Sequence, residues 1–464
     1  MIGLPHPYFT QDLPGIGGRF KAELPDFIVE EVPLYHPSDQ GEHTFFEVEK
    51  TDLSTLEALE RIARRLGVST GQIGFAGLKD RKGITRQWFS VRLVPPEAIT
   101  SLEIDGIRIT WARLHTNKLR TGHLRGNRFR LRVRDVDPRP ERVAAIVGRI
   151  QHEGMPNYYG PQRFGNRGDA FKVGRALLGR KNEYAVRRLL GFPQPTEHNP
   201  NVVEARRRFM AGDFAGAFAE FPGSYRQERR VLGYLIRSSG NFDGAIRQLS
   251  EPLRRLYSSA YQSFLYNRVL EARLAASGNS LRKLYVGDLA WIHRSGAVFR
   301  VESPEREEPR ADVFEISPSG PIFGKKMIQP SGIQAEIEAQ VLTNEGLRAT
   351  DFHRLMPGLH LEGGRRPLRV PLRELEYRLE GADLLLSFFL PKGSYATTFL
   401  RELMKNEESP AGAYERDSEE LSASVVGETT IPAPTTVSLL TGGSGETALS
   451  EGDLEADDEP PFGD

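Results

Sequence analysis

The sequence predicts an α+β protein in which a strand-rich domain is interrupted by a largely helical insertion. Residues 1–155 alternate between strand-like and helix-like patterns, whereas residues 157–363 are more helical and rich in arginine. A strongly apolar strand pattern then returns at Leu384–Leu390. Strands at both ends with a helical block between them indicate one domain that the insertion divides.

Three segments have clear helical patterns. In residues 54–66, Ser54 and Glu57 form a capping box and Gly67 is a natural C-terminal stop. The apolar spacing of residues 258–276 predicts a second, buried helix, and a short third helix is expected through Leu400 and Leu403 after a turn at 391–394. The first helix has one apolar face, made of Leu56, Leu59, Ile62 and Leu66.

The clearest strand covers residues 127–136, where apolar and basic side chains alternate. One face is therefore apolar and the other carries four guanidinium groups. Two interpretations remain open: a solvated outer face, or a sheet surface that faces phosphates. The alternating residues are Phe129, Leu131 and Val133 on one face and Arg128, Arg130, Arg132 and Arg134 on the other.

The formal net charge of zero conceals a strong asymmetry along the chain. Residues 407–464 contain 15 of the 62 acidic side chains and one of the 62 basic ones, so they carry −14 and residues 1–406 carry +14. The acidic tail is too poor in apolar residues to offset the entropy cost of ordering, so we expect it to be disordered. The basic body could attract a polyanion through counterion release.

The composition excludes several classes of protein and site. There are no cysteines, which removes disulfides, thiolate metal sites and cysteine nucleophiles and is typical of a reducing cytoplasm. No apolar run approaches the roughly 20 residues that cross a bilayer, and the N-terminus does not resemble a secretory signal. The ten histidines show no metal-ligand spacing, so no metal is expected. We predict a cytoplasmic protein without membrane contact.

The most informative segment is Gly74–Val91, in which two strand-like runs flank a polar turn. Asp80 lies in this turn, beside Lys79, Arg81 and Lys82. Nearby cations favour the ionised form of a carboxylate, and such a group suits chemistry at the sugar of a polyanion. An ordinary hairpin turn, in which aspartate and glycine are common, explains the same residues.

Six segments, in the same order along the chain, resemble the TruD family of tRNA pseudouridine synthases. The resemblance covers roughly residues 15–406 and excludes the tail. It favours a catalytic role for Asp80, which matches the catalytic aspartate of that family. The segments are residues 21–31, Gly41-Glu42-His43, Gly74–Val91, Gly126–Phe129, residues 157–165 and residues 390–398.

The resemblance implies a particular fold. The pseudouridine synthase catalytic domain has a mixed, mainly antiparallel sheet, and a TRUD insertion domain gives a V-shaped molecule with an RNA-binding cleft. We accordingly expect the catalytic domain in residues 1–155 and 364–406, the insertion domain in residues 156–363 and the disordered tail in residues 407–464.

The resemblance also implies an activity, the isomerisation of uridine to pseudouridine in tRNA at position 13 of the D arm. Atoms are conserved in this reaction, so we expect no cofactor. One carboxylate must act at the ribose, as a nucleophile at C1′ or as a base at C2′, and the sequence does not separate these routes.

Further site residues follow from the same match. Lys21 matches a lysine near the catalytic aspartate, where it would keep the carboxylate ionised. An extruded uridine needs an aromatic platform and a polar reader. Phe27 and Tyr395 match the aromatic positions, although the family commonly has phenylalanine at the latter, and Asn127 matches the amide reader. Phe129 is equally consistent with strand packing and with substrate contact.

The expected partner is tRNA, with no obligate protein partner and a monomeric state. We expect the insertion domain to grip tRNA through basic side chains such as Arg163, Arg167 and Lys172. Two other classes remain as alternatives. A non-catalytic RNA-binding protein would not need Asp80, and a glycoside hydrolase would need two carboxylates where this turn offers one acid among cations.

Overall fold

The computed structural model describes residues 6–406, except Asn166, Thr196 and residues 354–359. The predicted acidic tail, residues 407–464, lies outside the described residues. Within the described part of the chain, the fold is mixed α and β with mainly antiparallel sheets, which confirms the α+β prediction. No helix of the described part is both long and apolar enough to span a membrane.

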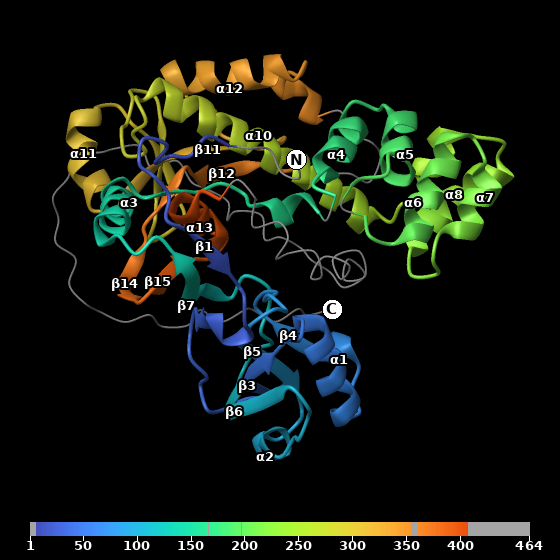
Figure 1. Ribbon diagram of the computed structural model, residues 1–464, viewed down its shortest axis with the longest axis horizontal. Coiled ribbons are helices and arrows are strands. Elements are labelled where there is room, and N and C mark those ends of the chain that lie inside the picture. Colours follow the sequence, from blue (N-terminus) through green and yellow to red (C-terminus); the bar gives the residue numbers. More distant parts are fainter. Residues whose placement is uncertain (1–5, 166, 196, 354–359, 407–464) are drawn as a thin grey trace, which may run out of the picture.

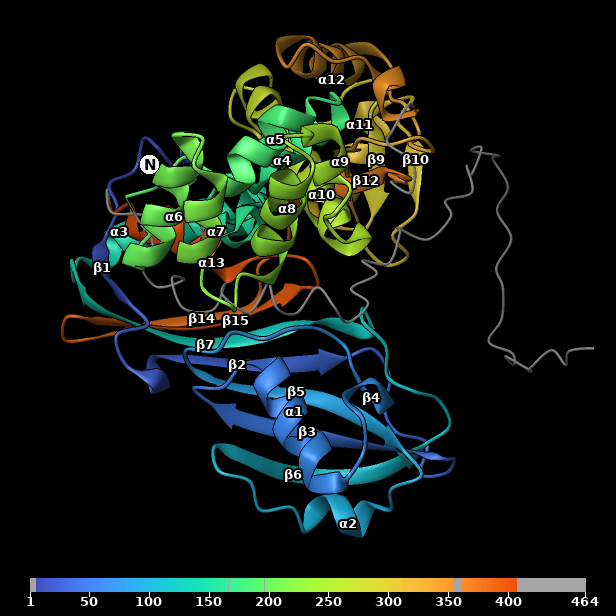
Figure 2. The same cartoon turned by 90° about the vertical axis from the view of Figure 1, so that its right-hand side faces the viewer.

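The main sheet has the strand order β14-β15-β7-β2-β5-β3-β6, with β1 beside β7 and β4 beside β5. Its neighbours pair antiparallel except β2 and β5, which are parallel. Figure 2 shows the strands in this order, with α1 lying across β5 and β3. The strands are β1 (Gly17–Phe20), β2 (Phe27–Pro33), β3 (His43–Thr51), β4 (Ile73–Phe75), β5 (Ile84–Arg92), β6 (Ile107–His115), β7 (Leu124–Val136), β14 (Arg373–Glu380) and β15 (Asp383–Pro391).

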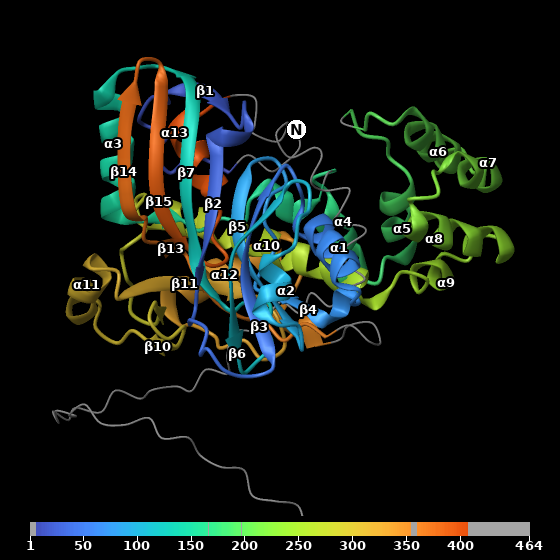
Figure 3. The same ribbon diagram turned by 90° about the horizontal axis from the view of Figure 1, so that it is seen from below.

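The last strands of the chain complete a sheet that its first strands begin. β15 pairs with β7 along its whole length, from Leu384 opposite Val133 to Pro391 opposite Gly126. Figure 3 shows the orange-red β14 and β15 beside the teal β7. The apolar alternation of β7 explains this central position, because Phe129 and Leu131 face the core that the sheet shares with the helices.

Helices cover one face of the main sheet at two places. α3 (Pro140–Glu153) and α13 (Ala396–Met404) pack on β7 and β15 through one apolar cluster, and α1 (Thr55–Leu66) packs on β3 and β5 through another. α1 confirms the first predicted helix, since Ser54 and Glu57 form the capping box and Gly67 adopts the left-handed conformation. The short elements here are η1 (Leu24–Asp26), η2 (Thr70–Gln72) and α2 (Pro96–Thr100).

The segment between β8 (Met155–Pro156) and β13 (Arg369–Val370) is mostly helical. These two strands pair with each other, so the two ends of the segment lie side by side. In Figures 1 and 3, α6 to α9 project away from the main sheet. The helices are α4 (Ala170–Leu178), α5 (Asn182–Leu190), α6 (Pro200–Met210), α7 (Phe214–Glu220), α8 (Arg226–Arg237), α9 (Phe242–Ile246), α10 (Glu251–Ala276), α11 (Pro304–Asp312) and α12 (Gly332–Asn344), with η3 (Pro161–Phe164) and η4 (Ala349–His353).

A second, smaller sheet lies in this segment, with the order β10-β9-β11-β12. Its strands are β9 (Leu289–Ile292), β10 (Val298–Arg300), β11 (Ile316–Ile322) and β12 (Gly364–Pro367). The predicted helix at 258–276 is confirmed as the C-terminal part of α10, which begins seven residues earlier because Pro252 is tolerated in a first turn. The division of the chain into domains stays a prediction.

Candidate active site

The Asp80 segment is the connection of a β-hairpin. β4 and β5 pair antiparallel, with Phe75 opposite Phe89, and residues 76–83 join them. This arrangement confirms the predicted strand, turn and strand. The Asp80 side chain is 30% exposed, so its carboxylate meets both the protein and solvent.

Hydrogen bonds from neighbouring elements fix the loop around Asp80. The Lys79 amide donates to Thr55 Oγ1 at the start of α1, over 2.8 Å. The Lys79 ammonium forms a buried ion pair with Glu31 on β2, at 2.6 Å, and the other oxygen of that carboxylate accepts from the Trp88 amide on β5 at 3.2 Å. The loop is therefore held by β2, β5 and α1 together.

Lys21 supplies a buried cation beside the carboxylate. Its Nζ lies 3.0 Å from Asp80 Oδ1 and 4.0 Å from the centre of the Phe27 ring, and its side chain is fully buried. The Lys21 backbone has φ +55°, a left-handed conformation that costs a non-glycine residue roughly 1–2 kcal/mol. The fold thus holds Lys21 in a strained conformation that directs its ammonium group to Asp80.

A second lysine, Lys50, holds the backbone at the same place. Its Nζ donates to the Asp80 carbonyl oxygen at 2.8 Å and also to the Leu53 carbonyl oxygen. Sequence reasoning missed Lys50, Glu31 and the pairing of Lys79. The signal was present, because Glu31 follows Phe27 and Val29 at the spacing of the apolar face of β2. A charged residue at such a position is buried and needs a partner.

Phe27 and Phe129 are both placed in the core. They are 2% and 6% exposed, their ring centres are 6.2 Å apart, and Phe129 stacks on Phe388 at 5.3 Å. For Phe129, where packing and substrate contact were both open, these contacts favour packing. Phe27 lies directly against the Lys21 ammonium, so it supports the Lys21–Asp80 pair from beneath.

Asn127 lies in β7, opposite Leu390 of β15 and opposite Glu31 of β2, which pairs with Lys79 in the Asp80 loop. Its Oδ1 is buried and has no hydrogen-bond partner within the described residues. A buried amide oxygen without a donor is costly, so this atom is suited to accept a hydrogen bond from a bound molecule.

Tyr395 belongs to a different cluster, at the start of α13. Its ring is tilted against that of Tyr159 at 6.2 Å, and Arg366 lies over the same Tyr159 ring at 4.2 Å. Burial raises the pKa of the Tyr395 hydroxyl, which therefore stays protonated at neutral pH. The structure thus brings together Lys21, Phe27 and Asp80, and places Tyr395 among residues of the 157–165 segment.

The arginine face of β7 is neutralised by carboxylates. Arg128 lies 2.9 Å from Glu374, and Arg132 lies 3.3 Å from Asp383. Arg134 lies 2.8 Å from the buried Asp26, and Arg130 has a more distant partner, Glu30, at 3.9 Å. Of the two sequence interpretations, these pairs favour an outer face that is charge-compensated over one reserved for phosphates.

The three basic residues expected to grip RNA differ in their surroundings. Arg167 is occupied internally, since its guanidinium donates to the carbonyl oxygens of Arg188, Gly191 and Phe192, and burial lowers its pKa. Its assignment to phosphate contact is therefore corrected to a structural role. Arg163 bonds Ser263 at 3.0 Å and lies over Tyr159, and Lys172 lies over Phe171.

Comparison with known proteins defines the class first. The fold matches a crystal structure of a protein from Methanosarcina mazei that is described as tRNA pseudouridine synthase D, with a TM-score of 0.74 and 29% identity over 87% of this chain and 97% of that one. The architecture is thus that of a pseudouridine synthase.

Sequence relatives define the family. A family model described as tRNA pseudouridine synthase D (TruD) matches residues 4–403. Proteins named tRNA pseudouridine synthase D from Geobacter sulfurreducens and Thermus thermophilus are 46% and 38% identical to the chain, covering 86% and 87% of it and 96% and 93% of their own lengths. The chain belongs to the TruD family.

Proposed function

We propose that this protein isomerises uridine to pseudouridine in tRNA, at position 13 of the D arm, with Asp80 as its catalytic carboxylate. The observation that carries the proposal is the Lys21–Asp80 pair, in which a buried ammonium lies 3.0 Å from a carboxylate that is itself 30% exposed. The two relatives described above are both named tRNA pseudouridine synthase D, which supports the reaction and the substrate class.

The chemistry fits one accessible carboxylate. The reaction breaks the bond from uracil N1 to ribose C1′, turns the base and forms a bond from C5 to C1′. C5 gives up its proton and N1 gains one, so no atom or electron is gained or lost overall. Asp80 acts either as a nucleophile at C1′ or as a base at C2′. In both routes it must be ionised, and the Lys21 ammonium donates a hydrogen bond to one of its oxygens.

The remaining residues would bind the extruded base. Asn127 Oδ1, which lacks a partner within the described residues, would accept a hydrogen bond from uracil N3–H. Tyr395 would offer an aromatic face and a protonated hydroxyl that phenylalanine lacks. Phe27 and Phe129 would support the site through packing, Phe27 against the Lys21 ammonium and Phe129 against Phe388. The rest of the RNA would contact basic side chains such as Arg163 and Lys172.

The decisive experiment compares Asp80→Asn with Asp105→Asn. The second variant makes the same chemical change at an exposed loop residue between α2 and β6. Pseudouridine is mapped in tRNA from cells that lack the protein and express each variant, and tRNA binding is measured in parallel. We expect Asp80→Asn to bind tRNA without forming product and Asp105→Asn to restore the modification. Product formation by Asp80→Asn would contradict the proposal.

A further inference from the structure

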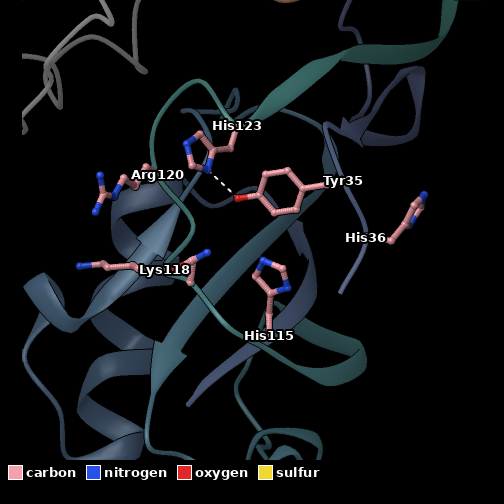
Figure 4. A pocket seen from close by; sticks show the side chains of 7 residues that line it. Tyr35, His36, His115, Lys118, Arg120 and His123 are labelled. Atoms are coloured by element: carbon pink, nitrogen blue, oxygen red, sulfur yellow. Dashed lines mark hydrogen bonds between the residues drawn. The ribbon is translucent and has the colours of Figure 1, made fainter. Parts of the chain in front are cut away.

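A concave site lies on the strand-rich part of the chain, apart from Asp80. Its volume is about 520 Å³, and it opens between the segment that follows β2 and the connection from β6 to β7 (Figure 4). This size is within the range of pockets that take one small organic molecule. The lining residues are Tyr35, His36, His115, Asn117, Lys118, Arg120 and His123.

One wall of this pocket is aromatic. The Tyr35 and His115 rings are stacked with centres 5.3 Å apart, and the Tyr35 hydroxyl is hydrogen-bonded to His123 Nδ1 at 2.6 Å. In Figure 4, Tyr35 lies between His123 and His115, with His36 on its far side. Flat rings held in this way offer a surface on which a planar base can stack.

Two of the lining residues, Lys118 and Arg120, are cationic, and none of the lining residues is acidic. Arg120 is exposed and has no acidic partner within the described residues, and Lys118 bonds one carbonyl oxygen, that of Gly71, at 2.6 Å. The Ser38 amide donates to His115 Nδ1 at 3.3 Å, so Nδ1 is the acceptor of that ring and Nε2 carries its proton. Two cationic side chains without an acidic residue in the lining favour an anionic ligand.

Hydrogen bonds connect one wall of the pocket to the hairpin that carries Asp80. The Gly122 amide donates to the Ala76 carbonyl oxygen at 2.8 Å, where that loop begins, and the Leu119 amide donates to Ser90 on β5 at 2.9 Å. The packing is tight, because a Cβ on Gly74 would lie 2.2 Å from the Leu119 carbonyl oxygen. The 116–123 connection therefore forms both a wall of the pocket and a support of the hairpin that carries Asp80.

We propose that this pocket binds one nucleotide of the RNA other than the target uridine. The base stacks on the Tyr35, His115 and His123 wall, and the phosphate lies between Lys118 and Arg120. This inference rests on the proposed function, because it takes the bound RNA to be the tRNA substrate. A nucleotide within RNA and a free mononucleotide both offer a planar base and a phosphate, and the test separates these two sources.

The test measures equilibrium binding of full-length tRNA to the full chain carrying Asp80→Asn, with and without Lys118→Ala/Arg120→Ala. We expect the added substitutions to weaken binding about tenfold and to lower the slope of log Kd against log salt by about one. The matched control is Arg92→Ala/Arg108→Ala, which removes two exposed arginines paired with Glu42 and Glu49. Equal weakening by both pairs would overturn the proposal, as would unchanged binding by the pocket pair.

A competition arm identifies the ligand chemistry. Uridine monophosphate should displace tRNA at millimolar concentration from the parent and not from the pocket variant, whereas inorganic phosphate should compete poorly in both. Equal competition by phosphate would show that the aromatic wall adds nothing, and the nucleotide assignment would fail. Arg120→Ala alone, at an exposed residue, keeps the test valid if the double variant folds poorly. Because binding is measured without turnover, these results are independent of whether Asp80 is catalytic.

Discussion

At the scale of single residues, Asp80 is held at two points by two buried lysines. Lys21 contacts its carboxylate and Lys50 its backbone carbonyl oxygen. Burying an ammonium is costly, and the fold bears this cost twice at one aspartate. The two lysines have different roles, because Lys50 holds the backbone of Asp80 and Lys21 places a positive charge beside its carboxylate.

This division predicts the effect of Lys21→Met. The variant keeps the length of the side chain and its contact with Phe27, but it removes the charged hydrogen bond to Asp80 Oδ1. Such bonds contribute about 1.5–3 kcal/mol, so we expect the single-turnover rate of pseudouridine formation to fall roughly 10- to 150-fold while tRNA binding changes little.

The control for this prediction is Lys326→Met, which removes an exposed lysine paired with Glu362 at 3.1 Å. Exposed pairs contribute little, so its rate should match that of the parent. A Lys21→Met enzyme as fast as this control would show that the Lys21–Asp80 contact has no part in the reaction.

At the scale of elements, the loop 76–83 ends on a close contact with β2. Gly83 has φ +141°, and a Cβ there would lie 2.5 Å from the Phe27 carbonyl oxygen and 2.8 Å from its ring. Glycine is therefore required for the loop to reach β2, where Phe27 supports Lys21.

Gly83→Ala should accordingly separate the loop from β2. We expect the free energy of unfolding to fall by roughly 1–3 kcal/mol, as for other overpacked sites, and product formation to fall with it. Gly71→Ala is the matched control, because nothing lies within 4 Å of its added methyl group. Urea denaturation and rate measurements on both variants check this, and similar losses at the two glycines would contradict it.

The elements also show what could be predicted from the sequence. Alternation and capping residues predicted β7 and α1, because local patterns determine them. The same local patterns could not predict that β15 pairs with β7 across the helical segment, or that Lys50 of β3 reaches Asp80. Motif resemblance singled out Lys21 and Asp80 and implied that they lie near each other, as they do in the structure.

Arg167 illustrates the opposite error. Its charge and its location in the insertion indicated phosphate contact, but charge alone does not reveal whether a guanidinium faces solvent or the carbonyl oxygens of its own fold. The arginine face of β7 could not be interpreted from the local sequence either, because the carboxylates that pair with Arg128 and Arg132 lie on distant parts of the chain.

At the scale of the whole molecule, the partly buried His293 links stability to pH. Burial lowers its pKa to about 4, with smaller contributions from Arg369 and Arg373, and its ring is hydrogen-bonded to Ser317 at 2.8 Å. In the unfolded chain the pKa is near 6.5, so below that pH the unfolded state binds a proton that the folded state does not. Stability is therefore lost as the pH falls from about 6.5 toward 4.

We expect His293→Gln to reduce this dependence while keeping a hydrogen bond to Ser317. Between pH 6.5 and 5, the free energy of unfolding of the parent should fall more steeply than that of the variant, by at most about 1.4 kcal/mol per pH unit. Urea denaturation at pH 7, 6 and 5 measures the difference. The other histidines are common to both proteins, so parallel curves would show that His293 does not titrate as assigned.

The order of the strands has a consequence for the nascent chain. The long edge of β7 that receives β15 is synthesised roughly 250 residues before its partner, which at about 5–20 residues per second leaves it open for tens of seconds on the ribosome. Open edges invite aggregation, and charged side chains discourage it. Glu374 and Asp383, which neutralise Arg128 and Arg132, arrive only with β14 and β15. Until then the charges of Arg128 and Arg132 discourage association with other nascent chains, and afterwards these two arginines pair with the late strands.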